Sequence, residues 1–257
     1  MNAVGPDHPA GPPVCVVVAS HPRSGTHLTV DFIRRNFRGF DPGVAPWRSS
    51  KFLYFELDEL LFRTVTGRHM KRFLRRRKFI AKTHHLFADE VCAKAASLLP
   101  SHRLIFLYPF RRISSTLRSL AEFAGASGPI SSFPDRREVY FGRDLTVAAC
   151  LRLHAENWLA SPARFVNVDD LLRDPDTAAL RLGEVLGEPP VPIDRRLPRP
   201  RRFGGGAVGE LAERLSRRES TLVPVARRID WESASAAAEI DGRFSDLFAR
   251  LAARQIN

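Results

Sequence analysis

Residues 20–27 place groups that bind anions between an apolar run and an amphipathic segment. The stretch reads SHPRSGTH, after VCVVVA and before LTVDFI. Arg23 offers a fixed positive charge, Ser24 and Thr26 offer hydroxyl donors, and Gly25 lets the backbone approach a ligand. The first backbone N–H groups of a helix are unpaired and carry the positive end of its dipole. This junction therefore predicts a site for a phosphate or a similar anion.

The loop is not a Walker A loop. That motif requires GxxxxGK followed by Ser or Thr, and the lysine is missing from this stretch. We therefore expect the loop to hold a phosphate-like group without binding a nucleoside triphosphate in the manner of a kinase.

Strands and helices that alternate along the chain must position this loop. Continuous apolar runs predict four buried strands, at residues 14–20, 78–83, 103–108 and 163–168. Helical spacing of apolar residues predicts helices at about 26–37, 88–99, up to 123, 145–160, 174–187 and 208–254. This order predicts an α/β fold whose parallel sheet is flanked by helices on both faces. We expect a flexible leader over residues 1–13 and a single domain over residues 14–257.

Three stretches carry weaker patterns. Residues 51–65 are predicted to be helical or mixed. Residues 124–143, with clusters of Gly, Pro and Ser, predict a long loop of the kind that forms a lid. Residues 188–210 are rich in Pro, Arg and Gly and show neither a helical nor a strand period.

The composition limits the compartment and the partners. A formal net charge of +12 favours polyanionic ligands, but an arginine excess often reflects genome composition, so we expect no nucleic-acid partner. Cys15, Cys92 and Cys150 are odd in number and too far apart to predict a disulfide framework or a zinc site. No apolar run approaches the roughly 18 residues of a membrane span, and the first residues lack the features of a signal peptide. We therefore expect a cytoplasmic protein without a membrane partner.

The stretch PRSGTHL after a buried strand resembles the 5′-phosphosulfate loop of PAPS-dependent sulfotransferases, PKSGTTW in cytosolic members and PRSGTTL in tyrosylprotein-type members. The resemblance implies a P-loop NTPase-like sulfotransferase fold and PAPS (3′-phosphoadenosine 5′-phosphosulfate) as co-substrate. Leu28 stands where cytosolic members place an adenine-stacking Trp. The loop residues implied to bind the co-substrate are Arg23, Ser24, Gly25, Thr26 and His27.

Two further stretches resemble the family in its order. AKTHHLF, residues 81–87, resembles KTHLP, which implies that Lys82 and His84 are the lysine and the catalytic histidine of that motif. The stretch FVNVDDLLRDPDTAALRLGEVLG resembles the YEDL…DP…FLG segment, with Val168 in place of the tyrosine.

A stretch near the C-terminus, RRFGGGAVGELAERL, resembles RKGxxGDW. Gly206, Gly209 and Glu210 match its glycines and acid, whereas the Arg-Lys pair is displaced. Arg201 and Arg202 stand just upstream, and we expect these arginines to reach the 3′-phosphate.

The segment for the 3′-phosphate allows two alignments. The family has an Arg at the end of the third strand and a Ser eight positions later. In LYPFRRISSTLRSL this spacing pairs either Leu107 with Ser115 or Arg111 with Ser119. Either alignment leaves an arginine and a hydroxyl at a strand-to-helix junction. We expect Arg111 to act with Ser115 and keep Ser119 as the alternative.

Sulfuryl transfer resembles phosphoryl transfer, so the residues must position the groups and stabilise charge. We expect His84 to act as the general base for a hydroxyl or amine acceptor, with Arg23 and Lys82 stabilising the oxygen toward the leaving phosphate. No metal is required, because arginines and helix dipoles neutralise the charge. His85 alternates to the other face of an extended segment, and His154 is expected to be structural.

Three other interpretations stay open: a P-loop-like nucleotide kinase or phosphotransferase, a non-catalytic polyanion-binding protein, and a sulfotransferase fold that binds without turnover. The acceptor is expected to be a small molecule or a saccharide. Residues 40–75 and 124–143 should shape its pocket. The basic run 71–78 is either a solvated helix face or a lining for an acidic saccharide.

Overall fold

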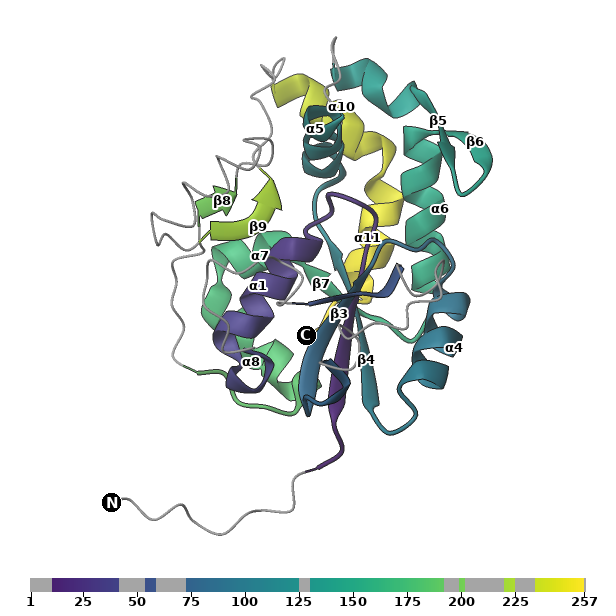
Figure 1. The fold of residues 1–257 in the computed structure, drawn as a ribbon. Helices are drawn as coiled ribbons and strands as arrows, with labels where there is room; N and C mark the ends of the chain where they lie inside the picture. Colours follow the sequence, from purple (N-terminus) through teal and green to yellow (C-terminus); the bar gives the residue numbers. More distant parts are fainter. Residues whose placement is uncertain are drawn as a thin grey trace, which may run out of the picture.

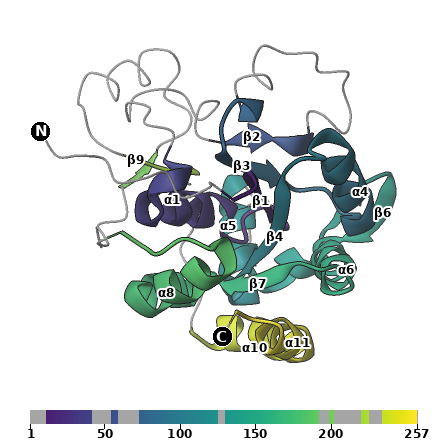
Figure 2. The ribbon, with the colours of Figure 1, turned by 90° about the horizontal axis from the view of Figure 1, so that it is seen from below.

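The computed structural model of the chain describes residues 11–41, 54–58, 73–124, 130–191, 199–201, 220–224 and 234–256. Its centre is a five-stranded parallel sheet (Figure 1). The strand order is β2-β3-β1-β4-β7 (Figure 2). The strands are β1 (Val14–Ala19), β2 (Phe55–Glu56), β3 (Lys78–Thr83), β4 (Arg103–Phe110) and β7 (Arg164–Asn167). The expected parallel α/β sheet is confirmed.

Helices cover both faces of this sheet, as expected. Viewed from below, α1 and α8 lie on one side of the strands, and α4, α6, α10 and α11 lie on the other (Figure 2). The helices are α1 (Thr26–Asn36), α4 (Ala88–Leu98), α5 (Ile113–Phe123), α6 (Val147–Leu159), α7 (Val168–Arg173), α8 (Pro175–Leu186), α10 (Ala234–Arg243) and α11 (Ser245–Ala253). Two short 3-10 helices, η1 (Arg38–Phe40) and η3 (Ile130–Asp135), accompany them.

The position of the central strand β1 explains why its sequence is continuously apolar. Cys15, Val17 and Ala19 pack into a core cluster shared with α4, α5, α6, α10 and α11. The alternate residues of the strand, Val14, Val16 and Val18, pack into a second cluster shared with α1, α7 and α8. Since successive side chains of a strand point to opposite faces, a sheet that is covered on both sides requires apolar residues at every position.

Local signals set the ends of α8 as the sequence predicts. Asp174 Oδ1 accepts a hydrogen bond of 3.2 Å from the backbone N–H of Thr177, and Pro175 occupies the first turn. Gly187 ends the helix with a φ of 67°.

The prediction of an irregular loop over residues 124–143 is wrong for the part that the structure describes. Residues 130–135 form η3, and an antiparallel hairpin follows, built from β5 (Arg137–Tyr140) and β6 (Arg143–Thr146). Its two-residue turn has positive φ at both Phe141 (49°) and Gly142 (73°), the pattern that matches the twist of a hairpin. The strands are too short and too polar to show a clear period.

Two other predictions also need correction. Phe55 and Glu56, predicted helical or mixed, form β2 and pair with Ala81 and Lys82. Within the stretch predicted as C-terminal helix, β9 (Ser220–Pro224) pairs in parallel with β8 (Arg199–Arg201), which lies in a stretch predicted irregular. Strands that pair with distant segments show no hydrophobic periodicity of their own here, so the sequence does not predict them. None of the described helices has the length and apolarity needed to cross a bilayer.

Candidate active site

The sheet brings two predicted site segments to the same edge. β1 and β3 are parallel neighbours, with Ala19 in register with Thr83. The backbone N–H of Ser20 donates to the Thr83 carbonyl at 3.3 Å, directly beyond the paired residues. Because the carboxyl ends of both strands meet there, the loop after β1 lies beside His84, the first residue after β3.

The loop between β1 and α1 has a conformation that requires glycine. Arg23 has a φ of 68° and Gly25 a φ of 107°, both in the left-handed region. A Cβ on Gly25 would lie 2.4 Å from Cγ2 of Val168. α1 then begins at Thr26, whose hydroxyl bonds that of Ser20. A tight loop at the N-terminus of a helix is a geometry that suits an anion, and the anion-binding role expected for these residues stays a prediction.

Arg23 joins this loop to α5. Its Nε donates to Ser119 Oγ at 3.0 Å, and its guanidinium lies 5.2 Å from the centre of the Phe123 ring. Arg111 donates through one terminal nitrogen to the Arg23 carbonyl at 2.7 Å. The structure therefore brings Arg23, Arg111 and Ser119 together. Ser115 lies one turn earlier on α5 and is half-buried.

A second nitrogen of the Arg111 guanidinium, Nε, is placed to bind a ligand. Arg111 Nε is buried and has no hydrogen-bond partner among the described residues. Burial lowers the pKa of Arg111 to about 10, against the opposing charge of Asp169. The N-terminus of α5 is itself occupied, because Asp241 accepts from both the backbone N–H and the hydroxyl of Ser114 at 2.9 Å. An anion here would therefore meet side chains rather than the start of α5.

His84 is oriented as a proton acceptor. Its Nδ1 lies 2.7 Å from the Ser20 carbonyl, and its backbone N–H donates to Asp58 Oδ2 at 2.9 Å. Since a carbonyl oxygen can only accept, the proton sits on Nδ1 and Nε2 keeps its lone pair. Burial, followed by the charge of Lys82, lowers the pKa of His84 to about 3. The ring is therefore neutral near pH 7.

Lys82 lies beside this histidine and is held by residues of the β2 segment. Its Nζ forms an ion pair with Glu56 at 3.2 Å and lies 5.3 Å from the centre of the Tyr54 ring. The Tyr54 hydroxyl is 3.4 Å from Nε2 of His27. Burial is the first cause that lowers the pKa of His27 to about 3, and the further causes are the charges of Lys82, His84 and Arg23. The predicted cationic and imidazole groups thus converge on one place.

Sequence reasoning missed the residues that support these groups. Glu56 holds Lys82, and Asp58 accepts hydrogen bonds from the Thr83 hydroxyl and the His84 backbone. The available signal was the pair of acids at a spacing of two in FELD, of which Glu56 ends β2 and Asp58 lies in the helical residues directly after it.

Some predicted residues are not placed by the structure. Arg202 and Gly206 lie outside the described residues. Arg201 is described only through its backbone, as the end of β8. Their expected role at the 3′-phosphate therefore stays a prediction.

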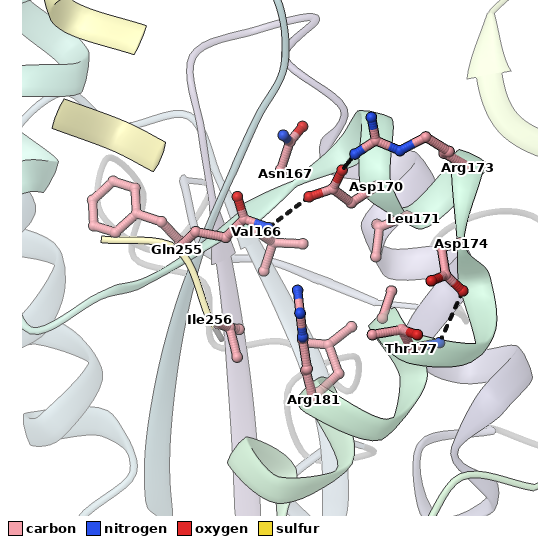
Figure 3. A pocket seen from close by; sticks show the side chains of 13 residues that line it. Val166, Asn167, Asp170, Leu171, Arg173, Asp174, Thr177, Arg181, Gln255 and Ile256 are labelled. Carbon is pink, nitrogen blue, oxygen red and sulfur yellow. Dashed lines mark hydrogen bonds and ion pairs between the residues drawn. The ribbon is translucent and has the colours of Figure 1, made fainter. Parts of the chain in front are cut away.

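A separate cavity of about 220 Å³ lies at the β7 edge of the sheet, between α7, α8 and the C-terminal residues (Figure 3). None of the predicted site residues lines it. Its carboxylates have structural partners: Asp170 accepts from Gln255 at 2.6 Å, and Asp174 caps α8. Within the described ranges, no three His, Cys, Asp or Glu residues form a group that could hold a metal ion.

No protein-family model matches the chain, and no curated protein matches it. Solved structures of similar shape include retinol dehydratase in complex with retinol and PAP, 14% identical over 94% of this chain and 80% of that chain, with a TM-score of 0.44. Mouse sulfotransferase SULT7A1 with PAP is 12% identical over 92% of this chain and 83% of that chain, with a TM-score of 0.46. The sulfotransferase domain of the Synechococcus PCC 7002 olefin synthase is 15% identical over 95% and 98%, with a TM-score of 0.45. Such identities and TM-scores do not assign a function, which we therefore take from the site.

Proposed function

We propose that the chain is a PAPS-dependent sulfotransferase that moves a sulfuryl group from PAPS to a hydroxyl or amine of a small-molecule or saccharide acceptor. One observation carries the proposal. A left-handed loop at the start of α1, which suits an anion, adjoins a neutral imidazole whose Nε2 is left to accept a proton. This pairing suits transfer of an anionic group to an acceptor that must lose a proton.

The residues present fit the two charged ends of such a co-substrate. The loop of residues 23–27 and the N-terminus of α1 suit the 5′-phosphosulfate. The 3′-phosphate fits the buried, unpartnered Nε of Arg111, with Ser115 or Ser119 as the hydroxyl donor. A phosphate there would supply the hydrogen bonds that Arg111 lacks.

In the proposed reaction the acceptor oxygen forms a bond to sulfur while the bond from sulfur to the 5′-phosphate oxygen breaks. Nε2 of His84 takes the proton of the acceptor hydroxyl, and its Nδ1–H stays on the Ser20 carbonyl, which fixes the ring. Negative charge grows on the leaving phosphate oxygen, where Arg23 and Lys82 stabilise it. PAP leaves with the electron pair of the broken bond.

Glu56 is a positioning residue in this proposal. Its carboxylate holds Nζ of Lys82 at 3.2 Å and so keeps the ammonium at the edge of the sheet that carries His84. The charge of Lys82 also helps to lower the pKa of His84, which keeps the base unprotonated.

The test is transfer of ³⁵S from labelled PAPS to a panel of simple alcohols, phenols and amines, in parallel with transfer of ³²P from ATP and Mg²⁺. The proposal expects labelled sulfate esters or sulfamates and no phosphorylated product. Phosphoryl transfer from ATP without sulfuryl transfer would contradict it and favour the kinase interpretation. Absence of both, with intact PAP binding, would favour a fold that binds without turnover.

A further inference from the structure

A single carboxylate binds the chain at the proposed base. Oδ2 of Asp58 accepts a hydrogen bond of 2.9 Å from the backbone N–H of His84, and Oδ1 accepts one from the hydroxyl of Thr83. Hydrogen bonds to an ionised acceptor are stronger than those between neutral groups. Both oxygens of the Asp58 side chain therefore hold the turn that carries the imidazole.

Thr83 extends this contact to the next residue of the turn. Its hydroxyl donates to Asp58, and its Oγ1 accepts from the backbone N–H of His85 at 3.0 Å. Thr83 is fully buried and His85 is 3% exposed, so water does not replace these bonds. On the other side of the turn, Nε1 of Trp158 in α6 donates to the His85 carbonyl at 3.1 Å. Residues 83–85 are thus held as one unit between Asp58 and α6.

The order of the strands explains how Asp58 reaches the base. In the sheet, β3 lies between β2 and β1 (Figure 2). Asp58 follows β2, His84 follows β3 and Ser20 follows β1, so the three residues lie at the same edge with His84 in the middle. Asp58 holds the backbone of His84 from one side, and the Ser20 carbonyl lies 2.7 Å from its Nδ1 on the other. The bond between the ring and Ser20 therefore depends on where Asp58 holds the backbone.

This bond to Ser20 decides which nitrogen of His84 can act. In a neutral imidazole one nitrogen carries the proton, and the hydrogen bonds of the ring set which one it is. While Nδ1 donates to the Ser20 carbonyl, Nε2 keeps its lone pair. If the backbone shifts and this bond is lost, the proton can move to Nε2. A ring protonated there has no lone pair at Nε2 to take the proton of an acceptor hydroxyl.

Asp58 and Glu56 have different partners although they are two residues apart. Glu56 forms an ion pair with Nζ of Lys82 at 3.2 Å, so its loss should act on a cation. Asp58 bonds a backbone N–H and a hydroxyl, so its loss should act on the position of the base. The two acids of FELD therefore have separable effects.

We propose that Asp58 is a positioning residue, whose carboxylate fixes the backbone of residues 83–85 so that Nδ1 of His84 stays on the Ser20 carbonyl and Nε2 keeps its lone pair. This inference rests on the proposed sulfotransferase function for the role of His84 as base. The effect of Asp58 on the imidazole itself can be measured without turnover.

The kinetic experiment compares Asp58→Ala and Asp58→Asn with the wild-type chain, using PAPS and a simple alcohol. Asp58→Ala should lower kcat by about tenfold to a hundredfold, the effect of a small displacement of a reacting group, and leave the affinity for PAP unchanged. Asp58→Asn keeps an oxygen that can accept from the His84 backbone, so it should recover most of the loss. The matched control is Asp176→Ala, an exposed acid in the first turn of α8, which should keep full turnover.

Thr83→Val removes one of the two bonds to the carboxylate and tests the same point if Asp58→Ala does not fold. It should lower kcat by about three- to tenfold, again with unchanged affinity for PAP. An unchanged kcat in the Asp58 and Thr83 variants would overturn the proposal. So would an affinity for PAP that falls as much as kcat, because such a loss indicates a general structural role.

A second readout does not depend on turnover. In ¹⁵N spectra of the imidazoles, His84 of the wild-type chain should be protonated on Nδ1. Asp58→Ala should move part of this protonation to Nε2, and Asp176→Ala should not. If no sulfuryl transfer occurs while Asp58→Ala changes the His84 signals, the proposed function is wrong and the positioning role stands. If the wild-type chain transfers sulfuryl groups and Asp58→Ala changes neither kcat nor these signals, the positioning role is wrong and the proposed function stands.

Discussion

The β1–α1 loop and the β5–β6 hairpin lie against each other, with the rings of His21 and Tyr140 5.8 Å apart, and they are built differently. The loop is fixed by backbone conformation, by the packing of Gly25 against Val168, by a hydrogen bond to Ser119 of α5 and by a hydrogen bond from Arg111, which lies just before that helix. The tip of the hairpin rests on ring contacts, and its Val139 side chain is 77% exposed. This difference indicates that the proposed anion side of the site is preformed, whereas the proposed acceptor side is free to adapt.

The largest expected effect concerns His84, which lies beside the β1–α1 loop. His84→Ala removes the proposed base, so kcat should fall by about 10²–10⁴-fold, the usual contribution of general acid–base catalysis. Binding of PAP, measured by calorimetry, should change little because the loop remains intact. His102→Gln is the matched control and should keep full turnover. If His84→Ala is fully active with an alcohol acceptor, the base assignment is wrong.

Replacing one glycine in each region tests whether the β1–α1 loop is more constrained than the β5–β6 hairpin. Gly25→Ala adds a Cβ at 2.4 Å from Val168 to a residue with a φ of 107°, so PAP affinity should fall by about a hundredfold or more and stability by ~2–4 kcal/mol. Gly142→Ala, at the hairpin turn, meets open space and a φ of 73° only, so it should cost ~1 kcal/mol and leave PAP binding intact. Calorimetry and urea unfolding measure both quantities. Equal effects of the two substitutions would show that the loop is not the more constrained region.

Arg111→Ala tests whether nucleotide binding and acceptor binding depend on different residues. Loss of a charged, buried hydrogen-bonding partner should reduce the preference for PAP over ADP by about tenfold to a hundredfold. The acceptor KM should stay unchanged at saturating PAPS. The control is Arg112→Ala, because Arg112 is the next residue in the chain and is exposed. If Arg111→Ala weakens PAP and ADP equally, the 3′-phosphate lies elsewhere.

Measuring the affinities for PAP and ADP also distinguishes the roles of Ser115 and Ser119 on α5. Ser119 holds Arg23 through a hydrogen bond of 3.0 Å, whereas Ser115 stands one turn nearer to Arg111 along the helix. Ser119→Ala should weaken PAP and ADP alike through Arg23, by about three- to tenfold. Ser115→Ala should weaken PAP alone by a similar factor. Reversed results would assign Ser119 to the 3′-phosphate.

The smallest expected effect is on the pH profile. His84 must be neutral to accept a proton, and its pKa is lowered to about 3, so kcat/KM should stay flat as the pH falls from 8 to about 5. Lys82→Met removes a charge that lowers this pKa, so the acid limb should move upward in pH. Lys94→Met, on the exposed surface of α4, should leave the limb in place. A wild-type limb near pH 6.5 would contradict the buried, cation-flanked setting of His84.

The sequence predicts the fold around the β1–α1 loop well because the relevant signals are local. A buried strand, a turn with Gly25 and an amphipathic helix lie within about twenty residues, and β1 and β3 become neighbours through ordinary parallel pairing. Placing His84 beside the loop then requires only that both segments follow the carboxyl ends of their strands. The ends of α8 were predictable for the same reason, since Asp174 and Gly187 act within their own turns.

The acceptor side depends on contacts between distant segments, which leave no local pattern. The β5–β6 hairpin is short and half-exposed, so the sequence predicts a loop up to residue 143 and the start of a helix at Leu145 and Thr146. His154, expected to be structural, is buried, and the pairing of its ring with Tyr108 and His21 follows from the packing of α6 against β4 and the β1–α1 loop. Glu56 and Asp58 were missed because β2 has only two residues.

The central claim is that the loop around Gly25 and the side chain of Arg111 together bind an adenosine nucleotide with a phosphate at each end. A thermal shift assay with PAP, ADP and AMP at equal concentrations tests it most directly, with heparin as a non-specific polyanion. The account predicts clear stabilisation by PAP, less by ADP and least by AMP, and loss of the PAP preference in Arg111→Ala. Equal stabilisation by PAP and AMP, or stabilisation by heparin alone, would contradict it.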